Sequence, residues 1–261
     1  MKKSLIRRHE SKIGWQALLL FFITLITTLL VTAPATLLAK LVEKSSNGQF
    51  VLANVSGSVW HGVAAPAIRQ RGGALLVLEK LHWNIDILPL FSGKMAVQFQ
   101  WDNLTQTLPM EVMFSFGKIE LRNAVVPLQA MVIGELMPML QPAQLSGQLQ
   151  IRSENFIFTK AGINGNAVAE WVNAGSVLSA VNPLGSYNIK LAGAGERVDI
   201  SLATISGTLL LEGSGSFKLD QGLKFQATAR AAADSKGSIN ELLNNLGPET
   251  APGVHTLNLM R

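Results

Sequence analysis

The side chains that most often carry catalysis or bind metals are few in this chain and widely spaced. There is no cysteine, and the four histidines (His9, His61, His82 and His255) form neither an H-E-x-x-H nor an H-x-x-x-H pair, the spacing that marks a histidine metal site on a helix. The 17 Asp and Glu residues are scattered. No nucleophile elbow, P-loop or dinucleotide-binding glycine motif is present. The sequence therefore predicts no enzyme activity, no metal and no cofactor.

One short segment has the composition of a binding surface. Residues 56–62 read S-G-S-V-W-H-G, and tryptophan is enriched at the strongest points of protein interfaces. Gly57, Trp60, His61 and Gly62 are therefore candidate interface residues. The alternative interpretation is structural: Trp60 covers an open end of a sheet while His61 faces solvent. The sequence leaves both interpretations open.

The charge of the chain is concentrated at its N-terminus. Residues 1–12 hold five basic side chains and one acidic one, and so contribute +4 of the formal net charge of +5; the rest of the chain is close to neutral. A domain that binds DNA or RNA carries its basic residues on its folded surface. The sequence pI of about 9.6 thus reflects the N-terminal tail, and no nucleic-acid partner is expected.

The basic tail is followed by a long apolar segment. Residues 13–33 are uncharged, almost entirely apolar and bounded by Pro34. A helix of this length spans about 31 Å, the thickness of the hydrocarbon core of a bilayer. Because basic residues favour the cytoplasmic side of a membrane, we expect residues 1–12 in the cytoplasm and the chain after residue 40 on the other side of the membrane. The sequence predicts a single-pass membrane protein whose larger part lies outside the cytoplasm.

A cleaved secretory signal is the alternative for this segment. Ala33 and Ala35 form an A-x-A-like pair of the kind that precedes a cleavage site. The apolar region of a signal peptide is only about 7–15 residues long, whereas this one is longer. An uncleaved anchor is therefore the favoured interpretation.

Beyond a linker at 34–49, which begins with a short helical exit from the membrane, apolar and polar side chains alternate with a period of two. A strand with this pattern has one buried face and one wet face, as in an antiparallel sheet. Glycine-containing breaks about every ten residues predict consecutive hairpins. The predicted fold is mainly antiparallel β, a twisted sheet that is half-open or barrel-like. The clearest alternating apolar sets are Leu81/Trp83/Ile85/Ile87, Met95/Val97/Phe99/Trp101, Tyr187/Ile189/Leu191 and Val198/Ile200/Leu202.

Two segments interrupt the alternation and are predicted to be short helices. Residues 128–140 have helical spacing of apolar side chains between prolines, and residues 238–246 begin at a serine and end before Gly247-Pro248, a strong helix stop. The expected organisation is a cytoplasmic tail (1–12), a transmembrane helix (13–33), a linker (34–49) and a periplasmic β-rich domain (50–261). Helix 128–140 would join two lobes of that domain, 50–126 and 144–235.

Several short motifs then follow one another in a recognisable order. They are G-x-x-W-x-G at Gly57–Gly62, L-x-W at Leu81–Trp83, P-L-G-S-Y at Pro183–Tyr187 and L-L-N-N-L-G at Leu242–Gly247. With the N-terminal anchor, this order resembles the protein N family of the type II, or general, secretion pathway. Ser206-Gly207-Thr208 departs from the family pattern, which is Gly-Pro-Leu-like at that turn.

The resemblance implies a non-catalytic accessory component of the inner-membrane machinery that exports folded proteins from the periplasm. Its expected partners are other inner-membrane secretion subunits and the membrane itself, with no small-molecule substrate. The layout also looks like periplasmic lipid-transport bridges, whose half-open β folds carry acyl chains along an apolar interior. That alternative predicts a continuous apolar groove that solvent can reach, whereas a scaffold predicts a filled core.

Overall fold

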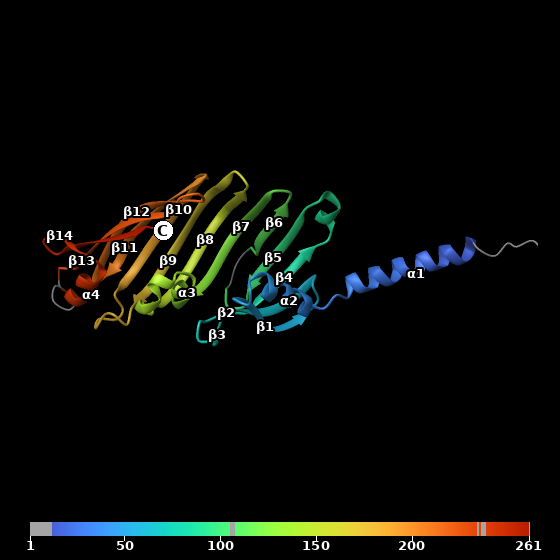
Figure 1. Cartoon of the computed structure of the whole chain (residues 1–261), viewed down its shortest axis with the longest axis horizontal. Helices are drawn as coiled ribbons and strands as arrows, with labels where there is room; N and C mark the ends of the chain where they lie inside the picture. Colours follow the sequence, from blue (N-terminus) through green and yellow to red (C-terminus); the bar gives the residue numbers. More distant parts are fainter. Residues whose placement is uncertain (1–11, 105–107, 234, 236–238, 261) are drawn as a thin grey trace, which may run out of the picture.

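The computed structural model describes residues 12–104, 108–233, 235 and 239–260 (Figure 1). Residues 1–11 of the predicted cytoplasmic tail lie outside these ranges. Ser238, at the start of the second predicted helix, also lies outside them. The chain begins with helix α1 (Lys12–Val31) and helix α2 (Ala35–Ser45). Pro34 separates them and caps α2. The predicted linker thus contains a helix of three turns.

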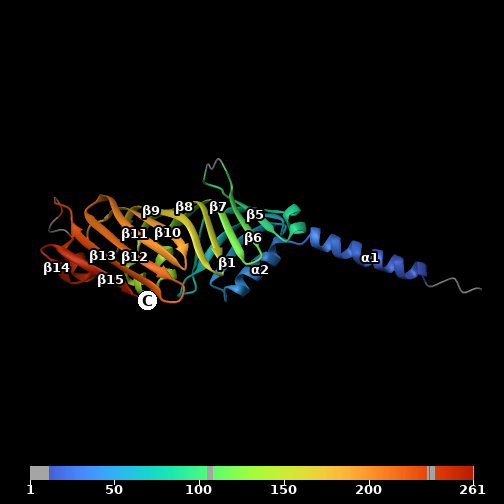
Figure 2. The same cartoon turned by 90° about the horizontal axis from the view of Figure 1, so that it is seen from above.

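Helix α1 projects away from the rest of the molecule (Figures 1 and 2). Its segment Gly14–Val31 is long and apolar enough to cross a membrane, and none of that segment is buried against the protein. Three threonines within α1, and Thr32 directly after it, donate their hydroxyl hydrogens to the carbonyl oxygens four residues earlier. These bonds give each hydroxyl a hydrogen-bond partner within the helix. A hydroxyl in an apolar surrounding needs such a partner, because burying it unpaired costs free energy.

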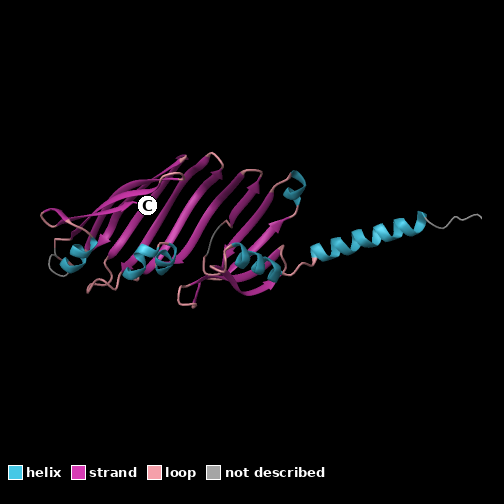
Figure 3. Cartoon of the chain, in the orientation of Figure 1, coloured by secondary structure: helices cyan, strands magenta, loops and turns pink. Residues whose placement is uncertain are grey.

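The described residues after α2 form one antiparallel sheet of 15 strands (Figure 3). Their order follows the chain, except that β3 pairs beside β2 and β15 lies between β13 and β14. The strands are β1 (Phe50–Gly57), β2 (His61–Arg69), β3 (Leu75–Val77), β4 (Leu81–Asp86), β5 (Met95–Trp101), β6 (Met110–Ser115), β7 (Lys118–Gln129), β8 (Ser146–Thr159), β9 (Gly162–Gly175), β10 (Gly185–Gly195), β11 (Arg197–Gly207), β12 (Leu209–Lys218), β13 (Gly222–Ala231), β14 (Glu249–Ala251) and β15 (Val254–Met260).

The sheet is open. Among the described residues no pairing joins β1 to β14, the strands at its two ends. The predicted antiparallel fold is confirmed, and of the two forms expected, the structure has the open sheet and not the closed barrel.

The first predicted helix is present but shorter and displaced. Strand β7 continues to Gln129, and helix α3 (Met131–Leu136) and the 3-10 helix η2 (Pro138–Ala143) follow it. Leu128, which we expected to begin the helix, pairs with Leu149 of β8. Strands β7 and β8 pair from Lys118↔Thr159 to Gln129↔Gln148. The sheet is therefore continuous past α3.

The chain ends differently from the prediction. Helix α4 (Asn240–Leu246) lies within the predicted range 238–246. Two strands, β14 and β15, follow it, whereas the second predicted lobe ended at residue 235. Strand β15 pairs with β13 along its whole length, so the C-terminal segment completes one end of the sheet.

Candidate functional site

The predicted interface residues form the tight turn between β1 and β2. Gly57 pairs with Gly62, and the backbone N–H of Ser58 donates to the carbonyl oxygen of His61 at 2.8 Å. Gly57 adopts a φ of +93°, and a Cβ there would lie 2.5 Å from the carbonyl oxygen of His61. Only glycine fits this backbone without strain. The side chain of His61 is exposed.

This turn also holds the end of α1. The indole Nε1 of Trp60 donates a hydrogen bond to the carbonyl oxygen of Leu30 at 2.8 Å, and the backbone N–H of Val59 donates to Ala33 at 2.8 Å. Leu30 lies in the last turn of α1, where carbonyl groups run out of helical partners, and Ala33 lies in the connection that follows α1. Trp60 therefore fastens the apolar helix to the sheet, and its half-buried ring packs with the residues around Trp83.

Two sequence motifs meet at the same place. Trp83 of the L-x-W motif donates its indole hydrogen to the carbonyl oxygen of Val59 at 3.0 Å. The ring of Trp83 lies over Gly62, where a Cβ would be 2.3 Å from its Cζ2 atom. The backbone N–H of Ile85 donates to the carbonyl oxygen of Trp60. The G-x-x-W-x-G and L-x-W motifs are thus parts of one packing unit that joins the helix to the sheet.

Most apolar side chains of the long strands lie on one side of the sheet, called here the apolar face. Pairing between neighbouring strands places these side chains opposite one another, in rows that cross the sheet. One row runs from β4 to β8 through Ile85, Val97, Val112, Leu121 and Phe156. Another runs from β7 to β15 through Val126, Ile151, Ala169, Ile189, Leu202, Gly213, Ala227 and Leu257.

The apolar face is buried in two clusters near its ends and, at its centre, at Leu149, Tyr187 and Val198. At one end, α2 covers a cluster that includes Ala64, Trp83 and Val97; at the other, Leu242 and Leu243 of α4 cover Leu209 and Ala229. Between these clusters, from β7 to β11, the larger side chains of the apolar face are mostly half-buried, and Ile119 and Phe158 are exposed. The face is therefore continuous in register but incompletely covered, a feature that the alternation alone did not reveal.

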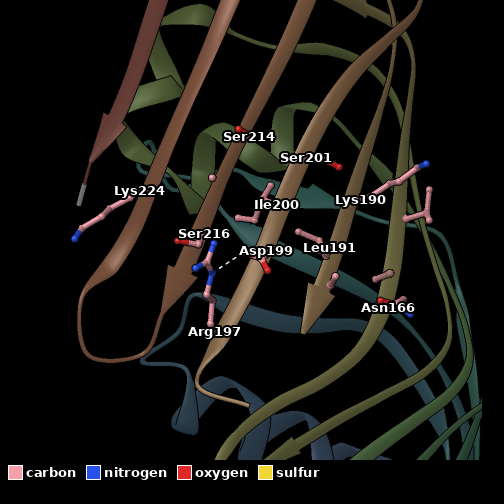
Figure 4. A pocket seen from close by; sticks show the side chains of 14 residues that line it. Asn166, Lys190, Leu191, Arg197, Asp199, Ile200, Ser201, Ser214, Ser216 and Lys224 are labelled. Carbon is pink, nitrogen blue, oxygen red and sulfur yellow. Dashed lines mark hydrogen bonds and ion pairs between the residues drawn. The ribbon is translucent and has the colours of Figure 1, made fainter. Parts of the chain in front are cut away.

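The opposite face carries the polar side chains and is hollowed over β9–β13 (Figure 4). The hollow has a volume of about 650 Å³, and basic side chains around it include Lys190, Arg197 and Lys224. The guanidinium Nε of Arg197 lies 2.5 Å from the carboxylate Oδ1 of Asp199. Among the described residues no group of three or more His, Cys, Asp or Glu side chains is placed to hold a metal ion.

Two groups with perturbed pKa values have structural roles. The buried Glu120 accepts hydrogen bonds from Lys118 Nζ at 2.6 Å and Arg122 Nε at 2.7 Å, which hold its pKa below the ordinary value. Burial raises the pKa of Tyr187, whose hydroxyl donates to the carbonyl oxygen of Leu209 at 3.0 Å. A carboxylate with a lowered pKa is a weak base, and a phenol with a raised pKa is a weak acid at neutral pH.

The two ends of the sheet present unpaired strand edges. Strand β1 pairs only with β2, and β14 pairs with β15 only at residues 254 and 255. From Leu257 onward, the outer edge of β15 has no strand beside it in the described part of the chain. Such edges are the positions at which a sheet can accept a strand from another protein.

Comparison with known proteins gives one family. The family model described as type II secretion system (T2SS), protein N, matches residues 49–258. The match begins just before β1 and extends into β15, so it spans the whole sheet. No curated protein and no solved structure matches the chain.

Proposed function

Because the chain belongs to the protein N family of the type II secretion system, we propose that it is an inner-membrane accessory component of that machinery, acting by binding proteins in the periplasm and not by catalysis. The family match over the whole sheet supports this proposal most strongly.

The membrane placement is supported by the N-terminal sequence and by α1. Basic residues 1–12 favour the cytoplasmic side, and α1 is long enough to span the bilayer. The sheet then lies in the periplasm. Anchoring confines it near other membrane-bound subunits, which raises its effective concentration toward them.

The open edges are the proposed contact surfaces. A partner strand can add to the unpaired edge of β15 through backbone hydrogen bonds. Residues next to this edge can then contact the side chains of the partner strand. This edge lies at the end of the sheet far from α1 (Figure 1).

Site-specific photocrosslinking in cells that contain the secretion machinery tests this surface. A photoreactive residue replaces Asn258, which is exposed on β15, and the matched control replaces Ser201, which is exposed on β11 within the sheet. We expect adducts with inner-membrane secretion subunits from residue 258 and not from residue 201. Equal adduct yields at both residues would argue against edge binding.

The incompletely covered apolar face favours a second candidate function, binding of lipid acyl chains. The half-buried row at the centre of the sheet is the continuous apolar surface that a lipid-transport bridge requires. Photocrosslinking separates the two functions. A photoreactive residue replaces Leu191, on the apolar face, or Lys190, on the opposite face, and mass spectrometry identifies the adducts. Lipid adducts at residue 191 alone, with normal secretion after gene deletion, would favour the lipid function.

A further inference from the structure

The connection between β4 and β5 exposes several apolar side chains to solvent. This connection is the 3-10 helix η1 (Leu88–Ser92). The side chains of Leu88 and Phe91 are 82% and 88% exposed, and the preceding Ile87 is also exposed. Leu and Phe side chains are costly to leave in water. A contiguous group of them commonly marks an interaction surface.

The same connection lies beside the end of the membrane helix. The backbone N–H of Ile85, two residues before Ile87, donates to the carbonyl oxygen of Trp60 at 2.7 Å, and Trp60 Nε1 donates to Leu30 of α1. A single residue therefore links the C-terminal end of α1 to the strand that leads into η1. Both views show η1 at the end of the sheet from which α1 projects (Figures 1 and 2).

The backbone of η1 is suited to an apolar surrounding. Pro89 has no N–H to satisfy, and the N–H groups of Leu90, Gly93 and Lys94 donate to carbonyl oxygens within the same turn. The hydroxyl of Ser92 donates to the carbonyl oxygen of Pro89 at 2.8 Å. Polar backbone groups in contact with lipid must be paired internally, and this turn pairs most of its own.

We propose that η1 inserts Leu88 and Phe91 into the surface of the bilayer leaflet next to the C-terminal end of α1. The occupant of this apolar patch is lipid, because Trp60 links the strand that leads into the patch to α1, the helix proposed to span the membrane. Lys94 is exposed immediately after η1 and can reach lipid phosphates while its stem stays apolar. The inference rests on the proposed anchor, and it adds a second membrane contact that the family match does not assign.

The second contact has a mechanical consequence. A sheet held by α1 alone is free to rotate about the helix axis and to tilt. Two contacts, at α1 and at η1, fix the orientation of the sheet relative to the membrane plane. The long axis of the sheet then points away from the bilayer, with β14 and β15 at the distal end (Figure 1).

Spin labelling of the full chain in vesicles tests the proposal, since the chain has no cysteine to compete for the label. Single-cysteine variants Leu88→Cys and Phe91→Cys carry a nitroxide in vesicles of phosphatidylethanolamine and phosphatidylglycerol. Leu219→Cys is the matched control, because Leu219 is 63% exposed in the β12–β13 turn, far from α1. Leu25→Cys, within α1, reports on the anchor itself.

The measurement compares collisions of each nitroxide with oxygen, which concentrates in lipid, and with a water-soluble nickel chelate. We expect oxygen to dominate at residues 25, 88 and 91, and the nickel chelate to dominate at residue 219. Nickel-dominated labels at 88 and 91, with a lipid-like label at 25, would overturn the η1 proposal and leave the anchor intact. An aqueous label at residue 25 would overturn the anchor. Labels at 88 and 91 shielded from both reagents would show a protein contact instead and overturn the lipid assignment.

Discussion

The packing of Trp83 against Gly62 leaves no space for a side chain at residue 62. A Cβ there would meet both the indole ring and the carbonyl oxygen of Ser56, at 2.3 and 2.7 Å. We expect Gly62→Ala to destabilise the protein by about 1–3 kcal/mol, the usual cost of overpacking. The matched control is Gly72→Ala, because a Cβ at Gly72 meets nothing within 4 Å. Thermal unfolding followed by circular dichroism measures both, and equal midpoints would contradict the packing described for this turn.

The charge cluster around Glu120 makes stability depend on pH. Hydrogen bonds from Lys118 and Arg122 lower the folded-state pKa of Glu120 below 4.5, so its contribution is present above the unfolded-state pKa and is lost as the pH falls through the folded-state pKa. We expect Glu120→Gln to cost about 1 kcal/mol at pH 7, since both basic partners are partly exposed.

Denaturant unfolding of Glu120→Gln and of the unsubstituted chain between pH 7 and pH 3 checks this prediction. The stability difference between them should shrink as the pH falls below 4.5. A difference that stays constant over this range would mean that the Glu120 charge has no net role.

At the scale of the elements, the two faces of each strand should respond differently to a charge. Val97 is buried on the apolar face of β5, whereas Gln100 is exposed on the other face of the same strand. Val97→Asp should destabilise by several kcal/mol, because it buries an unpaired carboxylate. Gln100→Asp should change stability by less than about 0.5 kcal/mol. Comparable losses in denaturant unfolding would mean that the faces are assigned wrongly.

The sequence predicted the sheet well because period-two alternation is a local signal. The set Met95, Val97, Phe99 and Trp101 lies on one face of β5, as the alternation indicates. The helix predicted at 128–140 was misplaced at its start because the spacing of Leu128 fits both a helix and the strand in which it pairs with Leu149. In such a short segment, pairing with β8 decides between the two.

Other features depend on contacts between distant segments, and the sequence does not encode them in a local pattern. The candidate Trp60 was found from its type and flanking glycines, but its bond to Leu30 joins residues 30 positions apart. The alternation does not reveal how much of the apolar face α2 and α4 leave uncovered. The exposure of Leu88 and Phe91 in η1 was likewise missed, since the segment has no periodicity.

At the scale of the whole molecule, the proposed topology predicts which side of the membrane each segment occupies. A reporter that is active only in the periplasm should work when fused after Lys44, at the end of α2, and should be inactive when fused after Lys12. An N-terminal sequence of the mature protein that begins at residue 34, 36 or 40 would show cleavage and contradict the anchor.

The central proposal is that the sheet binds other inner-membrane subunits of the type II secretion system. Its most direct test is affinity purification of the tagged full chain from native membranes, compared with a tagged fragment of residues 1–49 that keeps α1 and α2 but lacks the sheet. The account predicts that secretion subunits co-purify with the full chain and not with the fragment. Recovery of the same proteins with both, or of no secretion subunit with the full chain, would contradict it.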